Sequence, residues 1–209
     1  TFNRVNQISA LDKLYSSGEN DAVIFYSAPD GDIHETVKEF LAGKDFFYYK
    51  SVQVSPEEQI RLFTEAVNGQ LSTGSVTENT YAGALKAMLS EKCTKRVIVI
   101  DEFQYIVKFS DELITEILKC INNKWGNQPV LFILTSTNMY FVENHIVDKL
   151  KEAAYEISGI IKLNDLSFTD IVSYFDKYST EERILTYGIL GGRAGRIKCF
   201  DPKLSVKDN

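Results

Sequence analysis

Cysteine is scarce in this sequence, and its few copies are scattered. The three cysteines are Cys93, Cys120 and Cys199, with no CxxC spacing and no histidine close by. An odd number of widely separated cysteines argues against a disulfide framework and against a cysteine-based zinc site. We expect three reduced thiols without a role in function.

Long apolar runs are also missing. No segment approaches the roughly 18 apolar residues that cross a bilayer, and residues 1–4 lack the apolar core of a signal peptide. Positive charge is in deficit, because the net charge is −6. This argues against broad electrostatic binding to nucleic acid or to an acidic membrane, although it leaves a local basic patch open. We expect a cytoplasmic protein with no membrane partner.

What is present is an ordinary globular composition. The 209 residues are 44% hydrophobic and 25% charged. This length suits one medium domain, or one domain with the start of a second. We expect an α/β core over residues 1–165 and helices alone over 166–209, as the beginning of a further unit. The lack of an evident stop at the end of the chain suggests a fragment of a longer gene product.

The central feature is a β-branched run that ends in two carboxylates. Residues 96–100 read as a strand buried on both faces, and Asp101 and Glu102 follow it directly. In parallel α/β sheets, ligands bind outside the carboxyl ends of the strands. Asp101 would then hold Mg²⁺ through water, and Glu102 would polarise an attacking water, as in a Walker B segment. An acidic turn after a buried strand is also common without any ligand.

The remaining pattern alternates helices with strands. Further strands are expected at 22–26, 46–49, 130–134 and 155–163. Helices are expected at 3–17, 35–41, 55–69, 79–90, 110–121, 139–153, 167–174 and 179–190, with a short last one after Gly191-Gly192 and a turn at 125–129. Ser55-Pro56 followed by Glu58 is a strong helix start, because serine caps, proline suits the first position and glutamate reaches back.

Taken in order, these segments resemble the archaeal-type ATPase family, in the STAND branch of the AAA+ P-loop NTPases. The segments that carry the resemblance are 2–4, 97–105, 131–138, 166–168 and Tyr187-Gly188-Ile189-Leu190-Gly191-Gly192. The resemblance implies a five-stranded parallel sheet with helices on both faces, followed by a helical lid that starts near Leu166. It also implies a C-terminal winged-helix or nuclease-like domain as a partner within the same gene product.

The phosphate-binding loop departs from this family. A GxxxxGK[ST] loop wraps phosphates with backbone N–H groups and neutralises them with lysine. An ungapped alignment places Ser27, Asp32, Ile33 and His34 at its four defining positions. Asp30 and Asp32 add negative charge, and two like charges about 4 Å apart repel by about 4 kcal/mol at an effective dielectric of 20. No cofactor is therefore firmly predicted: ATP stays an open alternative, with Mg²⁺ at Asp101 only if ATP binds.

Other positions that handle nucleotide in the family are mixed. Asn138, at the end of the 131–138 strand segment, resembles the residue that senses the terminal phosphate. The family's Gly-Gly-x-Pro stretch, which contacts the base, appears as Gly191 and Gly192 without its proline. Arginines that relatives carry near 155–159 are missing. Phosphoryl transfer depends on such cations, so these departures from the family predict a chain deficient in ATP hydrolysis.

Three interpretations stay open. The first is a pseudo-ATPase that serves as a regulatory or interaction module with unknown protein partners. The second is an ATP-binding switch with an unorthodox loop. The third is a metal-dependent hydrolase using Asp101, Glu102 and His34, which requires these ligands to lie in one cluster. Separately, a basic segment could be a solvated helix face or could bind DNA or an acidic partner; its residues are Arg193, Arg196, Lys198, Lys203 and Lys207.

Overall fold

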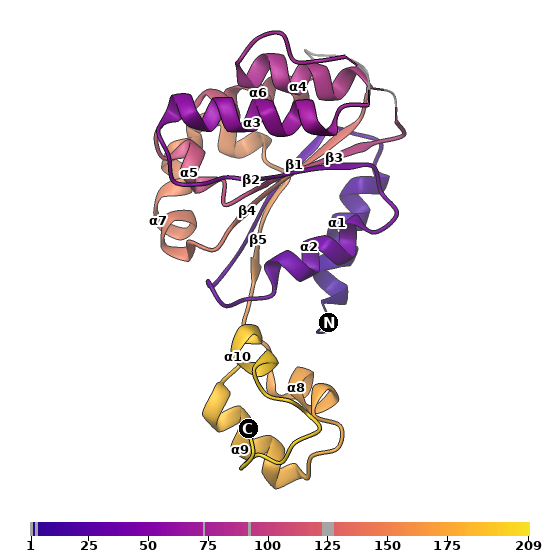
Figure 1. The fold of residues 1–209 in the computed structure, drawn as a ribbon, viewed down its shortest axis with the longest axis vertical. Helices are drawn as coiled ribbons and strands as arrows, with labels where there is room; N and C mark the ends of the chain where they lie inside the picture. Colours follow the sequence, from indigo (N-terminus) through magenta and orange to yellow (C-terminus); the bar gives the residue numbers. More distant parts are fainter. Residues whose placement is uncertain (1, 3, 73, 92, 123–127) are drawn as a thin grey trace.

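A single five-stranded sheet organises the chain. The computed structural model describes residues 2, 4–72, 74–91, 93–122 and 128–209. The sheet has the strand order β2-β3-β4-β1-β5, and every neighbouring pair in it is parallel (Figure 1). The strands are β1 (Asp21–Ser27), β2 (Phe46–Lys50), β3 (Arg96–Asp101), β4 (Val130–Ser136) and β5 (Gly159–Leu163). The predicted α/β fold class is confirmed.

The central strands are buried throughout, as their uninterrupted apolar runs predict. Every residue of β3 and β4 is buried. The strand expected at 155–163 is shorter than predicted, because β5 begins at Gly159 and residues 151–156 form a 3₁₀ helix, η1 (Lys151–Glu156). This strand lies at the edge of the sheet, where fewer neighbours cover it, so its apolar pattern marks its start less sharply.

Helices cover both faces of the sheet. Ile98 and Ile100 face the cluster formed with α3 (Pro56–Gln70), α4 (Tyr81–Ser90), α6 (Glu112–Ile121) and α7 (Met139–Leu150). Val97 and Val99 face the opposite side, toward α1 (Val5–Ser16) and α2 (Ile33–Leu41). Alternate residues of a strand point to opposite faces, so one apolar run fills two cores. Figure 1 shows α1 and α2 on one side and the larger helical layer on the other.

Helix starts follow their caps closely. The Ser55 side chain accepts from the Glu58 amide, with Pro56 at the first position of α3. The Glu58 carboxylate was expected to reach back to the start of the helix. In the hydrogen bonds that the structure describes, it instead accepts from Arg61 at 2.6 Å. A short helix, α5 (Gln104–Val107), was not anticipated. The turn predicted at 125–129 lies outside the described residues at 125–127.

A smaller helical unit follows the sheet and lies at one end of the molecule (Figure 1). It consists of α8 (Phe168–Tyr174), α9 (Thr180–Leu190) and α10 (Ala194–Lys198), and we call it the lid. Helices α8 and α9 follow Ser167 and Ser179, as the expected helices at 167–174 and 179–190 predict, and each starts with a full capping box. The lid has its own apolar cluster, which Phe2 joins from the start of the chain. The division at residue 165 stays a prediction.

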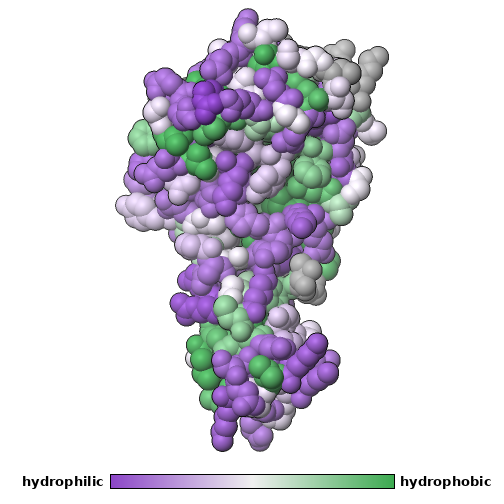
Figure 2. All heavy atoms as spheres, in the orientation of Figure 1, coloured by the Kyte–Doolittle hydropathy of each residue, from purple (hydrophilic) through white to green (hydrophobic). Residues whose placement is uncertain are grey.

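The surface is mostly polar, with apolar patches that include parts of the lid (Figure 2). On α9, Ile184, Leu185 and Ile189 are all more than half exposed. Among the described residues, no helix combines the length and the apolar character needed to cross a membrane.

Candidate functional site at the carboxyl ends of the strands

Asp101 ends β3 and is held by the two neighbouring strands. Its carboxylate, 1% exposed, accepts a hydrogen bond from the Tyr48 hydroxyl of β2 at 2.7 Å and another from the Thr135 hydroxyl of β4. Burial raises the pKa of Tyr48, and the hydrogen bond to Asp101 adds to the effect because a second negative charge beside the carboxylate is unfavourable. Asp101 is therefore a buried carboxylate with a fixed orientation.

Glu102 follows Asp101 in an unusual backbone conformation. Its φ is +53°, the one positive φ of a non-glycine residue in the described part of the chain. Its carboxylate accepts from the Thr137 hydroxyl at 2.7 Å and from the Gln104 amide at 2.6 Å. Burial alone would raise the pKa of Glu102, but the hydrogen bonds from Gln104 and Thr137 outweigh it and lower the pKa. Glu102 is therefore held as a carboxylate.

His34 meets these carboxylates from the other side. It lies in the first turn of α2, and its Nδ1 is 3.5 Å from Oδ2 of Asp101. The side chain is 43% exposed, so it stands between the buried carboxylates and solvent. One potential ligand atom from each of His34, Asp101 and Glu102 lies within 4.8 Å of the others. The single cluster required by a metal-site interpretation is thus present.

The other three predicted phosphate positions lie at the end of β1, in the loop that follows it and at the start of α2, and their side chains are buried. The Ser27 hydroxyl donates to the Ala28 carbonyl, and Ile33 enters the core under the sheet. Asp32, 1% exposed, is bound by Arg4 through Nε at 3.1 Å and Nη2 at 2.7 Å. These groups therefore already have partners within the chain.

The same loop joins the core to the lid. The Asp30 carboxylate accepts from Arg193 at 2.9 Å and lies 3.6 Å from Nε of Arg196. The Gly195 amide donates to the Asp30 carbonyl at 2.7 Å. A Cβ on Gly195 would lie 2.9 Å from that carbonyl, so glycine permits the close approach. Two acidic residues of the loop thus bind arginine side chains from the two ends of the described chain.

Among the contacts described, the remaining predicted positions make none with the carboxylates. Asn138 caps α7, because its Oδ1 accepts from the Phe141 amide at 3.0 Å. Gly191 ends α9 with φ +62°, and the Gly192 carbonyl accepts from the Leu166 amide at 2.8 Å. These glycines fix the path of the chain into Arg193 and have no described contact with the carboxylates.

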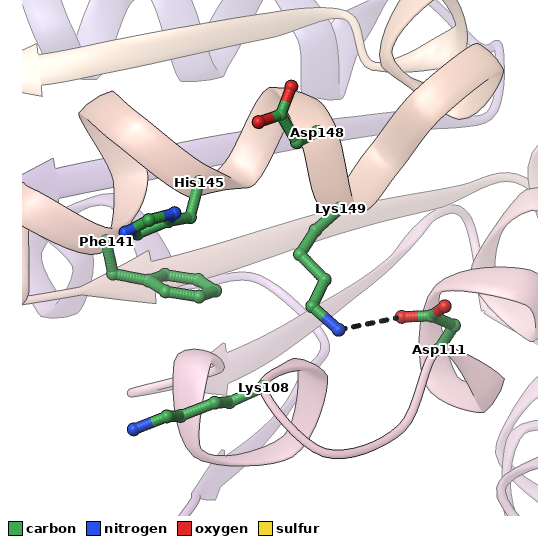
Figure 3. Close-up of a pocket in the computed structure, with 6 residues that line it drawn as sticks. All are labelled: Lys108, Asp111, Phe141, His145, Asp148 and Lys149. Carbon is green, nitrogen blue, oxygen red and sulfur yellow. Dashed lines mark ion pairs between the residues drawn. The ribbon is translucent and has the colours of Figure 1, made fainter.

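Three hollows are lined by residues of the site or of the helices next to it. One, of about 460 Å³, lies between α5, α6 and α7, where Lys149 pairs with Asp111 at 3.6 Å (Figure 3). A second, of about 380 Å³, includes Gln104 and Asn138 in its lining. A third, of about 630 Å³, is bordered by His34, Lys38 and Tyr48. Of these, the third reaches the carboxylate–histidine cluster through His34.

Several site residues were missed by sequence reasoning. Tyr48 orients Asp101, and nothing in its local sequence distinguishes it from other tyrosines. Gln104 and Thr137 lie in the segments 97–105 and 131–138 that carry the resemblance, but their contacts with Glu102 were not predicted. Arg4 belonged to a segment used for the resemblance, yet its pairing with Asp32 spans 28 positions. A usable signal was that a buried aspartate needs a counterion.

No family model matches the chain. An uncharacterized protein of Methanocaldococcus jannaschii is 16% identical over 189 residues, which are 90% of this chain and 41% of that protein. The chain therefore spans less than half of that relative.

Solved structures match over nearly the whole chain. A Walker-type ATPase of Pyrococcus abyssi has a TM-score of 0.70 at 14% identity, covering 94% of this chain and 66% of the ATPase. The fold is that of the P-loop ATPases. The Aeropyrum pernix ORC2 protein, in ADPNP–ADP complexes, gives 0.67 at 11% identity, covering 93% of this chain and 60% of ORC2. The ORC1 protein of the same organism, in complex with DNA, has a TM-score of 0.61 at 16% identity, covering 94% of this chain and 58% of ORC1.

Proposed function

We propose that this chain is an AAA+-type domain of the STAND branch that works without ATP, as a regulatory or interaction module. In this proposal the fold of a P-loop ATPase is kept, while its phosphate loop serves as an internal docking point for the chain's own arginines. The observation that carries it is the pairing of Asp32 with Arg4 and of Asp30 with Arg193. The loop therefore binds cations where a nucleotide would require it to bind an anion.

The residues present do not fit a nucleotide. A phosphate loop needs a lysine and a hydroxyl at its end, and the aligned positions hold the buried Ile33 and the partly exposed His34. A phosphate group here would face Asp30 and Asp32. Opening the buried Arg4–Asp32 pair costs about 3–5 kcal/mol, while millimolar binding supplies only about 4 kcal/mol. The two are equal in size, so little affinity remains.

Calorimetric titration of the protein with ATP and with ADP, each with Mg²⁺, tests this proposal. We expect no binding heat and no thermal shift at several millimolar nucleotide. A Mg²⁺-dependent ATPase rate that Glu102→Gln abolishes would overturn it. Glu39→Gln is the matched control, because Glu39 is an exposed carboxylate on α2 away from the strand ends.

A second candidate function has its own support. Arg4, Arg193 and Arg196 surround the acidic loop, and an anion could take guanidinium groups from Asp32 and Asp30. The chain would then be an ATP-binding switch whose phosphate contacts come from outside the loop. Micromolar ATP binding that Arg193→Ala weakens, and that Lys203→Ala leaves unchanged, would establish this function in place of the first.

Two further partners are proposed from the similar proteins alone: DNA, and additional domains of the same gene product. The ORC1 structure contains DNA, and relatives are longer than this chain. A winged-helix or nuclease-like neighbour in the same gene product would follow the family. Within the lid, however, Arg193 and Lys198 are paired with Asp30 and Glu35. We therefore expect a fluorescently labelled DNA duplex to show no salt-sensitive binding to this chain alone.

A further inference from the structure

We propose that His34, Asp101 and Glu102 bind a divalent transition-metal ion, with Zn²⁺ as the best fit, and that binding needs no nucleotide. This inference goes beyond the proposed function and is independent of whether ATP binds. It concerns one imidazole and two carboxylates that come from α2 and the end of β3.

The cluster contains two buried negative charges. Asp101 and Glu102 are adjacent carboxylates, 1% and 8% exposed. In the part of the chain that the structure describes, no lysine or arginine forms an ion pair with either of them. Buried carboxylates are normally paired with a cation or coordinated to a metal. A divalent ion would supply the missing positive charge.

The three ligand atoms are spaced nearly as a tetrahedral metal ion requires. Two ligand atoms that share a tetrahedral ion at about 2.0–2.2 Å lie about 3.4 Å apart. His34 Nδ1 and Asp101 Oδ2 are 3.5 Å apart, and all three ligand atoms lie within 4.8 Å of one another. From the 4.8 Å limit, the widest pair closes by at most about 1.4 Å on binding to reach that tetrahedral spacing. A small side-chain rotation of the partly exposed His34 provides such a movement.

The neighbours of the carboxylates form the outer shell that a metal site needs. Tyr48 and Thr135 donate to Asp101, and Thr137 and Gln104 donate to Glu102. Such hydrogen bonds fix the orientation of ligating carboxylates, and their loss typically weakens metal binding by about 10–100-fold. The cluster therefore has both ligands and the groups that hold them.

Access and metal type follow from the same residues. His34 and Tyr48 line a hollow of about 630 Å³, and the His34 side chain is 43% exposed, so the histidine of the cluster borders solvent. Three protein ligands leave a fourth tetrahedral position for water, as in open zinc sites. An imidazole ligand favours Zn²⁺ and neighbouring transition ions over Mg²⁺, which prefers oxygen ligands in octahedral geometry. The structure thus favours Zn²⁺ or Co²⁺ over Mg²⁺.

The test is titration of tag-free, metal-free protein with Co²⁺ and Zn²⁺ in the absence of nucleotide. We expect one ion per chain, the intense visible absorption of four-coordinate Co²⁺, displacement by Zn²⁺ and none by excess Mg²⁺. His34→Ala should weaken binding more than about 10-fold, and Tyr48→Phe should weaken it by about 10-fold. His145→Ala, which removes the other histidine of the chain, should change nothing.

Two results would overturn the proposal. One is undetectable binding of either ion, and the other is equal affinity in the parent protein and the His34→Ala variant. Cys199→Ser guards against a thiol site, because Cys199 is an exposed thiol. Metal binding that appears only with ATP would contradict both this inference and the pseudo-ATPase proposal. Metal binding without ATP would support this inference, and the pseudo-ATPase proposal would still be tested by titration with nucleotide.

Discussion

The guanidinium of Arg4 donates two hydrogen bonds to the carboxylate of Asp32, from Nε at 3.1 Å and from Nη2 at 2.7 Å. Both side chains are more than nine-tenths buried. This pair ties the segment before α1 to the loop that precedes α2. It places a fixed positive charge inside the chain, beside the loop between β1 and α2.

Breaking this pair should destabilise the fold strongly. Either Arg4→Met or Asp32→Asn leaves a buried group uncompensated, so we expect each to lower the unfolding free energy by about 3–5 kcal/mol. The double variant should cost less than the sum, with a coupling of about 1–3 kcal/mol in denaturant melts. Single costs below about 0.5 kcal/mol, or strict additivity, would show that the pair contributes little.

Asp30 should hold the lid against the core. Asp30→Ala removes the acceptor of Arg193 and the neighbour of Arg196, so we expect faster amide hydrogen exchange across α10. Glu39→Ala, on the exposed face of α2, is the control and should leave that exchange unchanged. Failure of Asp30→Ala to raise the exchange of α10 above that of the parent protein would contradict this contact.

Gly192 should tolerate no side chain. A Cβ there would lie 2.2 Å from the Leu166 carbonyl, which is backbone and has little freedom to move. Gly192→Ala should therefore cost about 1–3 kcal/mol of unfolding free energy. Gly188→Ala is the matched control: it lies within α9 with open space around it, and it should be neutral or stabilising by up to about 1 kcal/mol. Equal melting temperatures for the two variants would refute the close approach.

Alkaline pH should weaken the fold partly through Tyr49. Burial raises the pKa of Tyr49 to about 12, against about 10 in an unfolded chain. Between these values the unfolded state loses the proton while the folded state keeps it, so stability falls as pH rises. Denaturant melts of Tyr49→Phe should show a shallower fall above pH about 10 than the parent. Tyr155→Phe, at a ring that is 94% exposed, should follow the parent profile.

Much of the fold was predictable from local pattern. The uninterrupted apolar runs of β3 and β4 indicated strands covered on both faces, and Ser167 and Ser179 marked helix starts that the structure contains. Edge strand β5 was placed less well, because a half-exposed strand has a weaker pattern. The short helix α5 has no cap signal, and it was missed.

The candidate site was only partly predictable. Asp101 and Glu102 were recognisable because parallel strands bring their carboxyl ends to one edge. Their hydrogen-bond donors Tyr48 and Thr135 come from neighbouring strands, and strand order decides which side chains meet there. The pairing of the loop's aspartates with arginines was half visible. The aspartates could be read directly, while their partners could not.

By itself, the sequence determined the α/β class, the carboxylates at the end of β3 and the acidic character of the loop before α2, because these depend on neighbouring residues. Tertiary structure alone decided that Arg4 binds Asp32, that Arg193 binds Asp30, and that His34 lies beside Asp101. These contacts join residues 28, 163 and 67 positions apart. Local preferences act over a few residues, so pairings at such separations follow only from packing of the whole sheet and its lid.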